Sequence, residues 1–295
     1  MFKILNKFVM FLKKVIGELQ LIALSYLSDY LYLKYLYKKK LGKKLNLQNP
    51  QTFNEKIQYL KLYYRNDLLT ICADKFRVRE YVSEKINEDI LVPLLWVGED
   101  PTHIPFETLP DSFVIKTNHG SGMNIIVKDK NKINKEEIAK KIKKWLKINF
   151  YKFYKEWSYK NIKRKIIIEQ YLGDNVNDFK IFVFNNSAQF ILVVFDRYAD
   201  NVRNFYNLKW ELLDIKYCYN NSTKVIAKPY NLKKMINYAE ILSDKFPFVR
   251  VDFYEIDRKL YFGEMTFYPN AGFIKFLENH EKWDLAWGKL LRLDF

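Results

Sequence analysis

The spacing of apolar residues changes along the chain near residue 112. Before this point, apolar residues recur at helical intervals. Thr52 and Glu55 form a capping-box pattern, in which the two side chains satisfy backbone N–H groups at a helix start. A helix is therefore expected from Thr52 to about residue 64, and a second helix over residues 68–85. Residues 90–97 are expected to form a short buried strand.

After residue 112, short apolar runs bounded by Gly, Asn or Asp residues predict a series of strands. They cover residues 113–116, 124–127, 166–172, 179–184, 189–195, 249–255 and 259–265. Three further helices are expected, over residues 134–146, 232–245 and 283–290. Helices come early and strands dominate later, which predicts an α+β fold with mainly antiparallel pairing.

The formal net charge of +16 is concentrated in two stretches. Residues 1–48 hold 10 Lys against 2 acidic residues, and residues 128–165 hold 15 basic against 4 acidic residues, so the stretches contribute +8 and +11. A partner with repeated negative charge is consistent with this pattern, whether an anionic lipid or an acidic polysaccharide. Nucleic acid is not expected, because the chain has no zinc-finger spacing, RNP signature or arginine cluster.

Residues 1–48 are expected to form basic helices that precede the main fold. The apolar run over residues 15–33 is long enough to raise the question of a membrane span, but Glu18, Gln20 and Asp29 interrupt it. Two interpretations stay open: an amphipathic segment on the inner face of the cytoplasmic membrane, or helices packed on the core or on a second subunit. Two widely separated cysteines without metal-ligand partners indicate a reducing cytoplasm.

Lys116 ends one predicted strand and precedes a turn that contains Gly120, Ser121 and Gly122. Glycines let backbone N–H groups approach a phosphate closely, and the lysine supplies a fixed positive charge. The segment differs from a Walker A loop because its lysine precedes the glycines. A tight turn without any ligand explains the same residues, so both interpretations stay open at this point.

Two predicted strands near the C-terminus bring acidic and basic residues together. Arg250 and Asp252 are two residues apart on one strand and therefore project from the same face, and Glu264 lies near the end of the next strand. Two carboxylates beside a basic residue suit an Mg²⁺ ion that also binds nucleotide phosphates. The alternative is a cross-strand ion pair without a metal.

Taken in order, these segments resemble the ATP-grasp superfamily, and more specifically its TupA-like branch, which is linked to teichuronopeptide and capsule synthesis. The matching stretches are residues 49–58, 73–75, 116–122, 246–254 and 262–267. The resemblance spans about residues 48–290 and implies an ATP-grasp fold, in which two α+β lobes clasp a nucleotide. It divides the chain into an N-terminal basic amphipathic helical segment (1–48), a helical part (49–112), a nucleotide-clasping lobe (113–172) and an Mg²⁺-binding lobe (173–295).

The resemblance also implies cofactors, ATP and Mg²⁺, and roles for individual residues. The residues expected to contact the nucleotide are Lys116, Gly120, Ser121, Gly122, Glu169, Gln170 and Leu172. Those expected at the metal are Asp252, Glu264 and Thr266, and those expected to act on the transferred phosphoryl group or the acceptor are Arg250 and Lys180. Thr266 stands where better-known relatives place Asn, which leaves the number of magnesium ions open.

The function implied by the resemblance is that of a carboxylate–amine ligase acting through an acyl phosphate. The expected substrates are a uronic acid carboxylate of a capsular or other cell-surface polysaccharide and a small amine or amino acid. One alternative is a glycosyltransferase of surface-polysaccharide synthesis, although the chain contains no Asp-x-Asp motif. The others are a sugar kinase that uses the same nucleotide site and a membrane-bound scaffold without activity.

Overall fold

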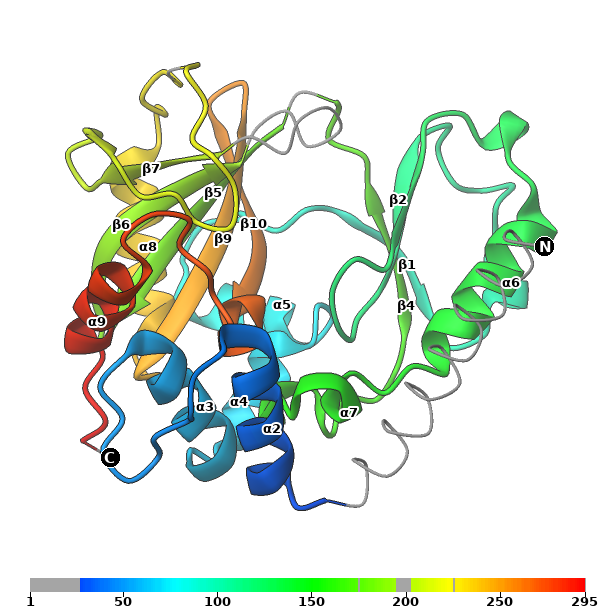
Figure 1. Cartoon of the computed structure of the whole chain (residues 1–295). Helices are drawn as coiled ribbons and strands as arrows, with labels where there is room; N and C mark the ends of the chain where they lie inside the picture. The colour runs from blue at the N-terminus through cyan, green and yellow to red at the C-terminus, as the bar shows by residue number, and fades with distance from the viewer. Residues whose placement is uncertain (1–26, 175, 195–202, 225, 295) are drawn as a thin grey trace, which may run out of the picture. The chain divides into compact units, whose positions relative to one another are not determined.

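The computed structural model describes residues 27–174, 176–194, 203–224 and 226–294, and it divides the chain into two compact units, 1–46 and 47–295 (Figure 1). The first unit contains helix α2 (Asp29–Leu41), which Ser28 caps by accepting a hydrogen bond from the Leu31 N–H. The helix ends at Gly42, whose φ of 75° is in the left-handed region. Helical structure expected over residues 1–26 lies outside the described residues.

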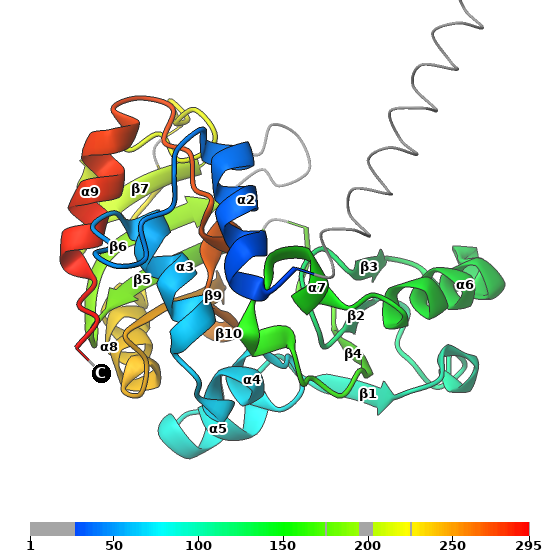
Figure 2. The ribbon, with the colours of Figure 1, turned by 60° about the horizontal axis from the view of Figure 1, so that its bottom comes forward.

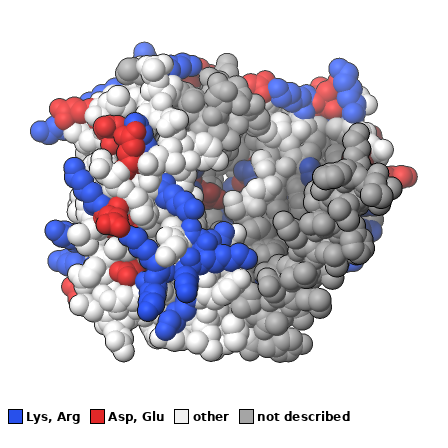
Figure 3. Space-filling model, in the orientation of Figure 1, with Lys and Arg blue, Asp and Glu red and all other residues white. Residues whose placement is uncertain are grey.

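Helix α2 carries basic residues beside exposed apolar side chains. Tyr30, Leu31 and Tyr35 are exposed, and lysines occupy its last turn. Figure 3, in the orientation of Figure 1, shows basic side chains gathered where α2 faces the viewer. None of the helices in the described part of the chain combines the length and the apolar character needed to cross a bilayer.

The second unit contains a four-stranded antiparallel sheet in the order β1-β4-β2-β3. Its strands are β1 (Leu94–Gly98), β2 (Phe113–Thr117), β3 (Asn124–Val127) and β4 (Ile166–Gln170). Helix α6 (Lys135–Leu146) packs Ile138 and Ile142 into the same apolar cluster as Phe113 and Ile115. Its lysines lie on the opposite face, so the sequence pattern of this amphipathic helix is confirmed.

A six-stranded antiparallel sheet follows in the order β10-β9-β5-β6-β7-β8. Its strands are β5 (Asn177–Phe184), β6 (Ser187–Val194), β7 (Arg203–Asn207), β8 (Leu212–Leu213), β9 (Phe248–Ile256) and β10 (Lys259–Thr266). Helix α8 (Leu232–Ser243) packs against β5, β6 and β9, and helix α9 (His280–Leu290) packs against α3 (Phe53–Tyr63) (Figure 2).

One face of this sheet is apolar at one end and charged at the other. Trp287 of α9 stacks on Phe190 with 4.5 Å between ring centroids and also meets Phe182 and Phe205. Residues paired directly across neighbouring strands share a face. Phe182 pairs with Arg250, so the aromatic cluster and the charged residues of β9 belong to one face.

The helix expected over residues 68–85 is two helices, so that prediction is wrong. Helix α4 (Asp67–Ala73) and helix α5 (Val78–Lys85) are separated by a turn at Asp74. The Asp74 carboxylate accepts hydrogen bonds from the N–H groups of Phe76 (2.9 Å) and Arg77 (3.3 Å). These local bonds compete with helix continuation, which ends α4.

The other predicted elements are present with shifted ends, including the capping box of Thr52 and Glu55 at the start of α3. Strands β7 and β8 were not predicted. Neither were helix α7 (Phe150–Tyr154) and the 3-10 turns, which are Pro101–His103, Lys130–Lys132, Trp157–Tyr159 and Pro269–Gly272.

Candidate active site

Asp252 is the centre of a buried network of ion pairs on β5, β9 and β10. Arg250 donates to both of its oxygens, from Nε to Oδ1 and from Nη2 to Oδ2, each at 2.7 Å. Lys180, which pairs with Asp252 across β5 and β9, donates to the same carboxylate and to Asp178 at 2.7 Å. Asp252 is only 1% exposed, so these cations replace the solvent that would otherwise stabilise its charge.

Glu264 and Thr266 complete this network from β10. Glu264 is the register partner of Asp252, and Thr266 is the register partner of Arg250. The Nη2 of Arg250 lies 3.0 Å from Thr266 Oγ1 and 3.4 Å from Glu264 Oε1. We call Asp178, Lys180, Arg250, Asp252 and Glu264 the carboxylate cluster.

The charges of the cluster set its proton affinities. Burial acts against ionisation of Glu264, but Lys75, Arg250 and Lys180 outweigh it and hold the pKa of that carboxyl well below its usual range. For Asp252, burial raises the pKa despite the opposing effect of Arg250 and Lys180. The Glu264 carboxylate is therefore the more readily ionised of the two.

Lys75, which was not predicted as a site residue, joins this cluster to the glycine loop (residues 117–123). Its Nζ lies 3.1 Å from Glu264 Oε2 and donates to the Gly120 carbonyl at 2.8 Å. Its own N–H donates to the Asn118 carbonyl at 3.0 Å. A single lysine of the α4–α5 turn thus contacts both the hairpin loop of the four-stranded sheet and the Glu264 carboxylate of the six-stranded sheet.

Asn118 fixes the glycine loop in place. This residue is fully buried and its amide donates to Asp74 Oδ1 at 2.8 Å and to the Lys163 carbonyl at 2.9 Å. Gly120 has a φ of +85°, and a Cβ atom there would lie 2.3 Å from the Phe150 ring. Both its backbone conformation and its close contact therefore require glycine.

A second ion pair joins Lys116, which immediately precedes the glycine loop, to Glu169. Lys116 Nζ lies 2.6 Å from Glu169 Oε2, and Arg79 Nη1 lies 3.4 Å from Glu169 Oε1. Glu169 is 7% exposed, so it is buried between two cations. Arg79 is a second functional candidate that was not predicted from the sequence.

The remaining predicted nucleotide contacts lie at the ends of these elements. Ser121 and Gly122 are exposed at the tip of the glycine loop. The N–H of Gln170 donates to the Pro93 carbonyl at 3.0 Å, and Leu172 is half-buried just after β4.

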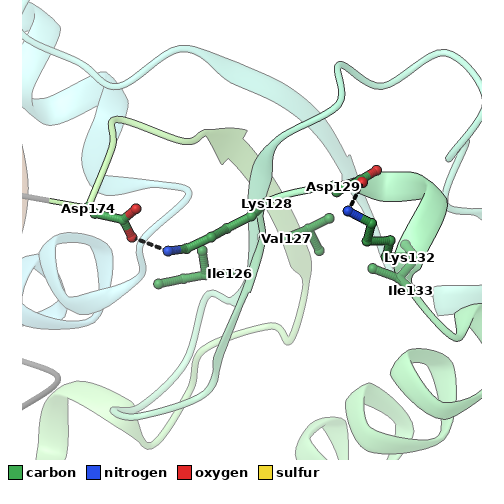
Figure 4. A pocket seen from close by; sticks show the side chains of 7 residues that line it. All are labelled: Ile126, Val127, Lys128, Asp129, Lys132, Ile133 and Asp174. Carbon is green, nitrogen blue, oxygen red and sulfur yellow. Dashed lines mark ion pairs between the residues drawn. The ribbon is translucent and has the colours of Figure 1, made fainter.

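A separate open pocket of about 400 Å³ lies at the β3 edge of the four-stranded sheet (Figure 4). It is lined by Ile126, Val127, Lys128, Asp129, Lys132, Ile133 and Asp174. Its charged side chains pair with one another, Lys128 with Asp174 and Lys132 with Asp129, and it contains no residue of the carboxylate cluster. We therefore assign it no part in the chemistry.

A family model described as "TupA-like ATPgrasp" matches residues 55–292 of the chain. The chain belongs to the TupA-like ATP-grasp family. The resemblance and the ATP-grasp fold expected from the sequence are thereby confirmed, and membership supports the expected class of ATP-dependent ligase. No curated protein is a significant match to this TupA-like chain.

Solved structures show more distant likenesses to this TupA-like protein. D-alanine–D-alanine ligase from Bacillus anthracis, complexed with ATP, is 16% identical over 68% of this chain and 55% of its own, with a TM-score of 0.39. The Helicobacter pylori enzyme of that name is 14% identical over 81% of this chain and 69% of its own, with a TM-score of 0.46. L-amino acid ligase from Bacillus licheniformis is 12% identical over 74% and 49%, with a TM-score of 0.43. The chain spans little more than half the length of the first of these structures.

The cluster of this TupA-like protein fits an Mg²⁺ ion that nucleotide phosphates help to bind. Asp252 and Glu264 offer hard oxygen ligands from paired positions, and the Glu264 side chain is 32% exposed. No group of three or more His, Cys, Asp or Glu residues suited to a metal occurs within the described residues. The two carboxylates therefore suit a metal whose remaining ligands are phosphate oxygens and water.

Proposed function

We propose that this TupA-like protein is an ATP-dependent carboxylate–amine ligase. The main support for the proposal is the position of Lys75, whose side chain contacts both the glycine loop and Glu264. A polyphosphate lying along this lysine would meet backbone N–H groups at one end and carboxylates suited to Mg²⁺ at the other. Such an arrangement serves phosphoryl transfer by positioning and charge neutralisation.

The proposed reaction has two steps. A carboxylate oxygen of the substrate attacks the γ-phosphorus of ATP, forming an acyl phosphate and releasing ADP. An amine nitrogen then attacks the acyl carbon, the bond between carbon and the phosphate oxygen breaks, and inorganic phosphate and a proton leave. Mg²⁺, when bound, neutralises phosphate charge and orients the γ-phosphoryl group.

In this proposal the residues divide between nucleotide binding and phosphoryl transfer. Lys116 and the glycine loop bind phosphates from the lobe of residues 113–172, and Glu169 with the backbone at Gln170 and Leu172 binds adenine and ribose. The lobe of residues 173–295 supplies Asp252, Glu264 and Thr266 for Mg²⁺. Arg250 and Lys180 neutralise the charge that develops on the transferred group.

We further propose that the carboxylate belongs to a uronic acid of a capsular or other cell-surface polysaccharide, and that the amine belongs to a small amine or amino acid. The net charge of +11 over residues 128–165 supports an acidic glycan, since opposite charges favour its encounter. The lysines and exposed tyrosines of α2 support peripheral contact with the anionic inner face of the cytoplasmic membrane.

Calorimetric binding of ATP with Mg²⁺ tests the nucleotide site. Lys116→Met is expected to weaken binding at least tenfold, which is about 1.4 kcal/mol. Lys132→Met is the control, because Lys132 is 83% exposed and its ion partner, Asp129, lies outside the proposed site. If the folded protein binds a UDP-sugar but not ATP, the result would contradict the proposal and favour a glycosyltransferase.

Product analysis then separates a ligase from a kinase. Mixtures of a uronic acid with amines are incubated with ATP, and products are identified by mass spectrometry. The proposal predicts ADP, phosphate and an amide, whereas a stable phosphorylated sugar would identify a sugar kinase.

A further inference from the structure

Arg203 lies on the same face of the six-stranded sheet as the carboxylate cluster. It begins β7 and pairs with Val194 of β6, which pairs with Asp178 of β5. Directly paired residues project from the same face, and two strand spacings separate Arg203 from Asp178 by about 10 Å between Cα atoms. Arg203 is therefore a neighbour of the cluster, although it is not a member of its ion-pair network.

The Arg203 guanidinium has no acidic partner among the residues that the structure describes. Its carbon lies 3.9 Å from the centre of the Tyr219 ring, and its Nε is buried without a hydrogen-bond acceptor in the part of the chain that the structure describes. This differs from Arg250, which donates to both oxygens of Asp252. Burial lowers the pKa of Arg203, but an arginine side chain stays protonated at neutral pH.

Asn221 supplies an unpaired acceptor beside this donor. It forms a parallel bridge with Arg203, and its Oδ1 is buried without a hydrogen-bond donor within the described residues. The fully buried Asn204 holds this segment in place, because its Oδ1 accepts from the Ser222 N–H at 2.9 Å and its Nδ2 donates to the Lys224 carbonyl at 3.0 Å. The unpaired groups are thus fixed to the sheet.

Buried polar groups without partners are rare and costly in folded proteins, and a charged group costs more than a neutral one. A carboxylate would satisfy the Arg203 guanidinium through charge-assisted hydrogen bonds. A hydroxyl or ammonium group on the same molecule would donate to Asn221 Oδ1. Tyr219, which is 44% exposed, adds a flat apolar surface beside the Arg203 guanidinium.

We propose that Arg203, Tyr219 and Asn221 bind a substrate carboxylate other than the one that is activated. This inference rests on the proposed ligase function. Arg250 contacts Asp252 and Glu264, whereas Arg203 does not, so we place the reacting carboxylate at Arg250. The carboxylate that binds to Arg203 is therefore a second one. Its source is either the α-carboxylate of an amino-acid nucleophile or a neighbouring uronic acid in a glycan.

Equilibrium binding tests the subsite without requiring turnover. Protein bound to Mg²⁺ and a non-hydrolysable ATP analogue is titrated with two pairs of probes: L-alanine against L-alaninamide, and a diglucuronate against D-glucuronate. In one pair, the member with the extra carboxylate is expected to bind at least about tenfold more tightly. The pair that shows the preference identifies the source of the carboxylate.

Three variants locate the preference. Arg203→Gln is expected to abolish the preference for the extra carboxylate and to leave the affinity for the probe without it unchanged. Arg203→Lys is expected to keep part of the preference. Arg258→Gln is the matched control, because Arg258 also stacks on a tyrosine, with its guanidinium carbon 5.2 Å from the Tyr230 ring centre, but lies in the β9–β10 turn. The control is expected to behave like the unchanged protein.

The inference is overturned if the unchanged protein shows no preference in either pair, or if Arg203→Gln keeps the preference. Failure of the proposed function appears separately, as absence of ATP binding or of ADP release by the same preparation. Retained nucleotide binding in Arg203→Gln shows that the variant is folded.

Discussion

Replacing Arg250 with methionine would test whether the carboxylate cluster is a balanced buried network. The Arg250 side chain is 12% exposed, and it donates to Asp252, which is almost completely buried. Methionine keeps much of the aliphatic volume but leaves Asp252 with Lys180 as its remaining cationic contact. Removing one partner of a buried ion pair costs about 3–5 kcal/mol, so the free energy of unfolding is expected to fall by that amount.

Magnesium is expected to stabilise the two proteins to different extents. Without Arg250, the oxygens of Asp252 and Glu264 gain room for a cation, so Mg²⁺ alone should stabilise Arg250→Met more than the unchanged protein. Mg²⁺ at about 100 times its dissociation constant adds about 2.7 kcal/mol to the free energy of unfolding. ADP release by the variant is expected to be lost, because the charge on the transferred phosphoryl group is no longer neutralised.

Urea unfolding followed by circular dichroism, with and without Mg²⁺, measures both effects. Arg258→Met is the control, since this exposed arginine in the β9–β10 turn is expected to change the free energy of unfolding by no more than about 0.5 kcal/mol. A free energy of unfolding for Arg250→Met within about 1 kcal/mol of that of the unchanged protein would refute a tightly coupled network. The reasoning would also be refuted if Mg²⁺ stabilised Arg250→Met no more than the unchanged protein.

Two further predictions concern the glycine loop and the pH dependence of stability. Gly120→Ala should weaken ATP binding and lower the free energy of unfolding by about 1–3 kcal/mol, because a Cβ at a φ of +85° would meet Phe150. Gly122→Ala is the control and should lower it by less, because its φ is +74° but no described atom lies within 4 Å of the added Cβ. For Glu156, burial raises the pKa from 4.5 to about 7, with Lys61 acting in the opposite direction. The folded state therefore holds this proton more tightly. The resulting contribution to the free energy of unfolding, on the order of 3 kcal/mol, should be lost as pH rises from about 4.5 to about 7. Between these pH values, the free energy of unfolding of Glu156→Gln should decline less than that of the unchanged protein. An identical decline in the two proteins would contradict the assignment to Glu156.

The C-terminal half of the site was predictable because strand geometry is local. Arg250 and Asp252 share a face since side chains alternate along a strand, and a short hairpin brings Glu264 beside Asp252. The capping box at Thr52 was predictable for the same reason, as its two residues are three positions apart. Lys180 joined this site through the family resemblance, and the structure pairs it with Asp252.

Lys75 and Arg79 were not predictable from local patterns. Lys75 meets Gly120, which is 45 residues away, and Arg79 meets Glu169, which is 90 residues away. Lys75 does belong to one of the short stretches that carry the family resemblance, which is the one signal that points to it. The Asp74 turn that presents Lys75 combines local bonds from the Phe76 and Arg77 N–H groups with a bond from Asn118, which is 44 residues away.

Arg203 was missed for a different reason. Strand β7 has the sequence Arg-Asn-Phe-Tyr-Asn, in which polar residues surround two aromatic ones, and this pattern resembles a loop. Its pairing with β6 and the anchoring by Asn204 become visible only in the assembled sheet. The buried donor at Arg203 is a property of tertiary structure and has no local sequence signal.

The most direct test of the ligase proposal follows an oxygen atom. Glucuronate labelled with ¹⁸O in its carboxylate is incubated with ATP, Mg²⁺ and an amine, and the released phosphate is examined by ³¹P NMR. An acyl phosphate intermediate predicts that one labelled oxygen passes from the carboxylate to inorganic phosphate as the amide forms. Turnover that yields unlabelled phosphate, or a phosphorylated sugar that keeps both labels in its carboxylate, would contradict the proposal.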